Sequence, residues 1–138
     1  MAKYEEMYPI SRPEELKRME RARPARERVL NHIEKAMMRV AAARYMILEN
    51  PYLALELLGA ANTSLANVHE SIEERWRGRV SELQSRGGVT YTRLRSIIVE
   101  RLIHEEAVPD RATLEGVMRD LDALHKSILT LYKDYVAG

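Results

Sequence analysis

Apolar residues recur every three or four positions along most of the chain, and this spacing constrains the fold more than any other feature. The clearest case runs from Leu114 to Tyr135, where seven apolar residues follow at intervals of 3, 4, 3, 4, 3 and 4. Such spacing places the side chains on one face of an α-helix. No segment alternates apolar and polar residues over the length of a strand. The pattern therefore predicts an all-α fold.

Three further segments carry an apolar stripe of the same kind. The four stripes consist of Val29, Ile33, Ala36, Val40, Ala43 and Ile47; Leu58, Ala61, Leu65, Val68, Ile72, Trp76, Val80 and Leu83; Leu94, Ile97, Ile98 and Leu102; and Leu114, Val117, Leu121, Leu124, Ile128, Leu131 and Tyr135. Helices joined by short turns bury such stripes against one another. We expect an antiparallel four-helix-type bundle. Trp76 lies within a stripe, which favours a core role over base stacking.

Proline and glycine set the expected helix boundaries. The expected helices cover residues 13–22, 24–49, 51–86, 91–107 and 110–136. Pro24 should end the first helix, because the residue before a proline is pushed out of helical geometry. Gly87-Gly88 should end the third. Asn50-Pro51 and Asp110 should begin the helices that follow them.

The N-terminal residues do not fit the bundle pattern. Residues 1–12 have no helical period and contain Tyr4, Tyr8, Pro9 and Ile10, which favours an extended arm with apolar side chains. We predict two parts: residues 1–23 form the arm and a short basic helix, and residues 24–138 form the helical bundle.

Charge is distributed in blocks, although the formal net charge is only +1. Residues 12–44 hold ten basic and five acidic residues, and residues 75–101 hold seven basic and two acidic ones. Residues 45–74 hold five acids and no base. Arginine supplies 17 of the 22 positive charges, and guanidinium binds phosphate oxygens in a bidentate way. The basic blocks are therefore candidate phosphate-binding surfaces.

The candidate nucleic-acid-binding residues are the bases of these two blocks that share helix faces or lie next to the arm. They are Arg12, Lys17, Arg18, Arg21, Arg23, Arg26, Arg28, Lys35, Arg39, Arg75, Arg79 and Arg86. Two alternatives remain open. The same residues could pair with Glu on solvated helix faces, or the alternating blocks could match acidic and basic patches between subunits.

The layout of arm, basic helix and compact bundle resembles the coat proteins of filamentous archaeal viruses. The resemblance covers the whole chain, with residues 4–28 as arm and DNA-facing helix and residues 29–136 as outer bundle. It implies a self-assembling structural protein of the virion, which packages double-stranded DNA in a helical filament. It also implies pairing with itself or a related coat subunit, and phosphate contacts without base readout. A membrane envelope is not indicated by the sequence.

No catalytic motif stands out, and the chain has no cysteine. We therefore predict no enzyme activity, no cofactor and no metal site. Two alternatives stay open. One is a small helical RNA-binding subunit of a ribonucleoprotein complex, which would be cytoplasmic. The other is a ribonuclease toxin, because Arg119 and His125 resemble the Arg-polar-x-x-x-x-His motif of HEPN-type ribonucleases.

Overall fold

The protein is a helical bundle. The computed structural model describes the backbone of residues 13–105 and 108–138, and the side chains from residue 24 onward within these ranges. In this part of the chain there are four α-helices: α2 (Pro13–Met46), α3 (Pro51–Ser71), α4 (Glu74–Ile103) and α5 (Arg111–Ala137). No described residue lies in a strand, so the prediction of an all-α fold is confirmed. The expected arm at residues 1–12 lies outside the described residues.

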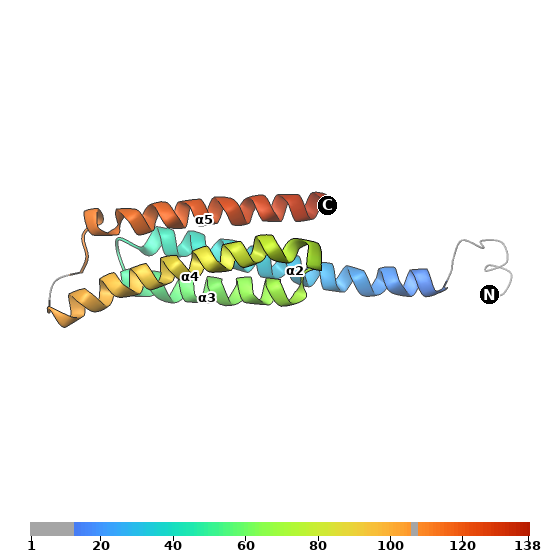
Figure 1. Ribbon diagram of the computed structural model, residues 1–138, viewed down its shortest axis with the longest axis horizontal. Coiled ribbons are helices and arrows are strands. Elements are labelled where there is room, and N and C mark those ends of the chain that lie inside the picture. Colours follow the sequence, from blue (N-terminus) through green and yellow to red (C-terminus); the bar gives the residue numbers. More distant parts are fainter. Residues whose placement is uncertain (1–12, 106–107) are drawn as a thin grey trace.

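The helices lie side by side along one long axis (Figure 1). Both α2 and α4 pack against α3 and α5, so the four helices form a ring in which α2 and α4 lie opposite each other. The first turns of α2 extend past the other helices at one end of the molecule, and the last turns of α4 extend at the other (Figure 1). No described helix combines the length and apolar character needed to cross a membrane.

The predicted stripes form the core. All residues of the stripes at 29–47 and 114–135 are buried. The stripe from Leu58 to Leu83 is buried except at Trp76, which is partly exposed but packs against the core. The expectation fails at Leu102, which is 57% exposed. Leu102 belongs to the last turn of α4, and the last turns of this helix extend past its neighbours (Figure 1).

The expected helix break at Pro24 is wrong, because α2 continues through this residue as one helix of 34 residues. A proline inside a helix removes one backbone hydrogen bond and costs about 3 kcal/mol. Pro24 is exposed, so its ring does not displace a side chain of the core. The expected short helix is therefore the beginning of α2, and the boundary between residues 23 and 24 falls inside this helix.

The expected stop at Gly87-Gly88 is also wrong, because α4 continues through both glycines. Gly87 is buried where α4 meets α3, and the side-chain amide of Asn62 donates a hydrogen bond of 3.1 Å to its carbonyl. A Cβ atom at Gly87 would lie 2.1 Å from Oδ1 of Asn62. The glycine is therefore needed for the close approach of two helices rather than for a turn.

The chain reverses at Ile72 and Glu73, which the sequence analysis placed inside one long helix. Both residues have extended backbone conformations. The reversal lets both halves of the stripe from Leu58 to Leu83 enter the same core. The helices that follow the two other turns, α3 and α5, begin as expected. Asn50 accepts a hydrogen bond from the Leu53 amide, and Asp110 accepts one from the Thr113 amide. The bond to the Thr113 amide holds the pKa of Asp110 below its ordinary value.

The adjacent glycines provide a matched test of this packing. We expect Gly88→Ala to stabilise the protein by up to about 1 kcal/mol, because alanine favours the helix and nothing lies within 4 Å of the new Cβ. We expect Gly87→Ala to destabilise it by about 1–2 kcal/mol, because Asn62 must move and lose its hydrogen bond. Urea unfolding measures both values. In an Asn62→Ala background the cost of Gly87→Ala should disappear; an unchanged cost would contradict the proposed contact.

Candidate nucleic-acid interface

The first basic block lies on α2. Arg12 precedes the described residues, whereas Lys17, Arg18, Arg21 and Arg23 belong to the first turns of α2. Arg26 is the first residue along α2 whose side chain has a described contact with another helix. The segment before it is the part of α2 that extends past the bundle in Figure 1.

Arg26 is partly buried against the end of α5. Its guanidinium donates a hydrogen bond to the backbone carbonyl of Tyr135 and lies 4.7 Å from the centre of the Tyr135 ring. A cation at a helix C-terminus is favourable, because the last carbonyls lack partners and carry partial negative charge. Arg26 therefore fastens α5 to α2.

Arg28 and Lys35 are exposed, and neither has a described hydrogen-bond or ion-pair partner. Because α2 is continuous through Pro24, Arg21, Arg28 and Lys35 occupy positions seven apart on one helix face. The same face holds His32, whose pKa lies below its ordinary value of 6.5. Burial is the main cause, and repulsion by Lys35 and Arg28 lowers the pKa further. These three positions with His32 are called the α2 basic face.

Arg39 joins α2 to α3. Its Nη1 donates to the carbonyl oxygen of Ala60 at 3.2 Å and to the hydroxyl of Ser64 at 2.6 Å. Ser64 is itself buried. The guanidinium of Arg39 therefore has its described contacts inside the molecule, unlike Arg28 and Lys35.

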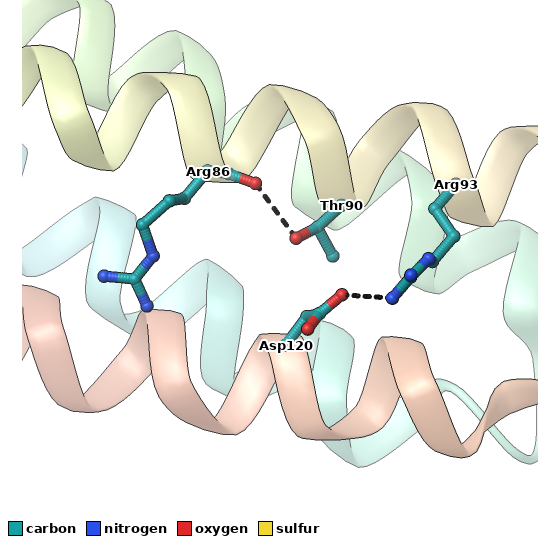
Figure 2. A network of polar contacts seen from close by, with 4 residues as sticks. All are labelled: Arg86, Thr90, Arg93 and Asp120. Carbon is teal, nitrogen blue, oxygen red and sulfur yellow. Dashed lines mark hydrogen bonds and ion pairs between the residues drawn. The ribbon is translucent and has the colours of Figure 1, made fainter.

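The second basic block forms a regular series of contacts between α4 and α5, which we call the arginine ladder. Arginines of α4 contact polar side chains of α5 at intervals of seven or eight residues, and part of the series is drawn in Figure 2. The contacts are Arg79 with Asp134 at 2.9 Å, Arg86 with Ser127 at 2.8 Å, Arg93 with Asp120 at 2.7 Å and Arg101 with Thr113 at 3.3 Å. The ladder explains why arginines recur at this spacing without requiring a ligand.

Trp76 lies at the end of the bundle where α4 begins and α5 ends. Its ring contacts Tyr135 edge to face, with the ring centres 5.4 Å apart. The guanidinium carbons of Arg75 and Arg79 lie 5.3 and 5.5 Å from its ring centre. A cation over an aromatic face is attracted by the ring electrons. The indole therefore contacts both the core and two arginines.

The candidate residues thus divide by what they contact. Arg26, Arg39, Arg79 and Arg86 bind other parts of the molecule, whereas Arg28, Lys35 and Arg75 are exposed and have no described carboxylate partner. Sequence reasoning missed the structural roles of Arg93 and Arg101. A signal was present, because Arg79, Arg86 and Arg93 are seven apart and so are Asp120, Ser127 and Asp134.

In the described residues no group of three or more His, Asp or Glu side chains is placed to hold a metal ion. Arg119 is exposed and His125 is partly buried, while Leu121, Leu124 and Ile128 between and beside them belong to the core. Comparison with protein-family models, with curated proteins and with solved structures found no match to this chain.

His32 reports on the α2 basic face. We expect Lys35→Gln to raise the pKa of His32 part of the way toward 6.5, because it removes one of the two repulsive charges. NMR titration of the imidazole protons measures the change. Since the folded pKa lies below the unfolded one, protonation of His32 should lower stability as the pH falls below about 6.5.

Lys126→Gln on α5 is the control for this titration, because Lys126 is not among the groups that act on His32. It should leave the pKa of His32 unchanged. An unchanged pKa in Lys35→Gln would mean that Lys35 does not lie close to the imidazole.

Proposed function

We propose that this protein is a self-assembling structural protein that coats double-stranded DNA through sequence-independent Arg and Lys contacts with phosphate. The observation that carries the proposal is the extension of α2 past the bundle, with basic positions on a single continuous helix (Figure 1). A helix that extends from a packed body can lie along a polyanion while the body contacts neighbouring subunits. In this proposal the bundle forms the outer wall of the filament, with its helices packed as antiparallel neighbours.

The exposed side chains of α2 support this assignment. Arg28 and Lys35 have no described hydrogen-bond or ion-pair partner, so no described side chain competes with phosphate for them. The four basic residues at positions 17–23 continue the basic segment toward the N-terminal end of α2. The proposal assigns no catalytic role to any residue, and the natural setting would be the virion of a filamentous, archaeal-type virus. Partners would be DNA and further copies of this chain or a related subunit.

Electron microscopy of the purified protein with and without duplex DNA tests assembly directly. We expect filaments whose formation DNA promotes, because each subunit contributes only part of a continuous coat. A monodisperse monomer that does not bind DNA at low salt would rule out the proposal. Filaments that form with RNA and not with DNA would redirect it to an RNA partner.

Two double variants that remove equal charge locate the surface. We expect Arg28→Gln/Lys35→Gln to weaken duplex binding by about tenfold and to reduce the dependence of log K on log salt by about two phosphate contacts. Arg111→Gln/Lys133→Gln removes two exposed charges of α5 and should have little effect. Fluorescence anisotropy over a salt series measures both. Equal losses in the two variants would place the DNA surface elsewhere.

A further inference from the structure

At Arg86 the arginine ladder lacks the carboxylate partner that Arg79 and Arg93 have. Arg79 and Arg93 lie seven residues, or two helical turns, before and after Arg86. They bind the carboxylates of Asp134 and Asp120. Arg86 between them binds only the neutral hydroxyl of Ser127, and no described carboxylate lies within ion-pair distance of it. Figure 2 shows its guanidinium reaching from α4 toward α5. A partly buried cation without a counter-charge favours an anion beside it.

Two cavities between α4 and α5 meet at Arg86. The larger has a volume of about 300 Å³ and is lined by Arg79, Glu82, Arg86, Lys126 and Ser127 among others. The smaller has a volume of about 200 Å³ and includes Thr90 and Asp120 in its lining. Since a water molecule takes up about 30 Å³ of liquid, the larger cavity has room for a phosphate group with some of its water.

The larger cavity is positive. Arg79, Arg86 and Lys126 line it, against the single carboxylate of Glu82. Glu82 is exposed, so its charge is hydrated and can turn toward solvent. Arg79 is committed to Asp134, which leaves Arg86 and Lys126 as the cations available to a ligand.

The donors suit a phosphate group. Arg86 uses one of its five N–H groups on Ser127. Two of the remaining N–H groups of the planar guanidinium can donate to two oxygens of one phosphate. Ser127 accepts from Arg86, so its own hydroxyl proton is free to donate. Thr130 adds nothing, because its hydroxyl donates to the Lys126 carbonyl.

From these observations we infer that the seam between α4 and α5 binds a phosphate group at Arg86, with Ser127 and Lys126 as the other donors. The ligand is either free phosphate or a phosphate of a nucleic-acid backbone, since both present the same oxygens. The inference is separate from the coat function, which depends on α2 and is tested there.

Ser127→Asp is the sharpest test, because it gives Arg86 the same counter-charge that Arg79 and Arg93 already have. The variant should fold at least as stably as the wild type, since it adds an ion pair of the kind present on either side. We expect wild-type thermal stability to rise in a saturable way when phosphate replaces chloride at constant ionic strength. Ser127→Asp should reduce the phosphate association constant by at least about tenfold, because the added carboxylate occupies the guanidinium and repels the anion.

Arg86→Gln should abolish the saturable effect, and Thr92→Asp should retain it. Thr92 is an exposed residue of α4 outside both cavities, so this variant adds the same charge without touching the site. A rise in stability that is equal in the wild type and Ser127→Asp would be the general effect of phosphate on protein surfaces and would overturn the inference.

A short DNA duplex distinguishes the two sources of the phosphate group. Weaker duplex binding in both Arg86→Gln and Ser127→Asp, relative to Thr92→Asp, would identify the ligand as a backbone phosphate. A saturable phosphate effect without any change in duplex binding would identify a free anion. If neither probe distinguishes Ser127→Asp from Thr92→Asp, the inference is wrong. None of these outcomes decides the coat function, because that function is measured with variants of α2.

Discussion

Burial of the apolar stripe on α2 is the interaction on which the arrangement of the other helices depends. Residues from Val29 to Ile47 along this stripe are essentially inaccessible to solvent. Burying a valine or isoleucine side chain of this stripe contributes about 1.5–3 kcal/mol, whereas an exposed ion pair contributes only about 0–1 kcal/mol. The stripe is covered by α3 and α5 together. With both neighbours of α2 fixed in this way, α4 closes the ring on the opposite side.

The position of α4 accounts for the polar character of its seam with α5. The inner residues Val80, Leu83, Leu94 and Ile98 of α4 are buried in the core between α3 and α5. The flank toward α5 is left for polar contacts, and the arginine ladder occupies it. Pairs such as Arg79 with Asp134 are about half exposed, and exposed pairs contribute only about 0–1 kcal/mol. Their regular spacing therefore matters more for the register of the two helices than for stability.

The periodicity of apolar residues predicted the inner faces of the helices well. The positions of glycine and proline predicted the helix ends poorly. Apart from Leu102, the predicted stripes lie in or against the core, because burial depends on the spacing of side chains, which the sequence shows directly. Pro24 and Gly87 failed as boundaries because tertiary context decides their effect: one is exposed in a helix that tolerates it, and the other lies under Asn62 of a different helix. The reversal of the chain at Ile72 could not be predicted in this way, because residues 70–74 contain no glycine or proline. Contacts between helices, such as that of Arg39 with Ser64, depend on a packing that one sequence does not specify.

The separation of structural from available arginines follows from the same packing. A sum of charges along the chain counts every arginine equally. In the fold, however, some arginines bind other helices and others are exposed without a described partner. Arg26 lies where α2 enters the bundle, so it meets the partial negative charge at the end of α5 and is used there. Two residues further along α2 the situation differs: Arg28, like Lys35, is exposed and lies outside the core stripe formed by Val29, Ile33 and Ala36, and no described acid forms an ion pair with either. Among the described basic residues of α2, Arg28 and Lys35 on its outer face have no described partner, whereas Arg26 and Arg39 are held by α5 and α3. Arg86 faces α5 beside two cavities and has a hydroxyl rather than a carboxylate as its described partner, and for this reason the seam carries an inference.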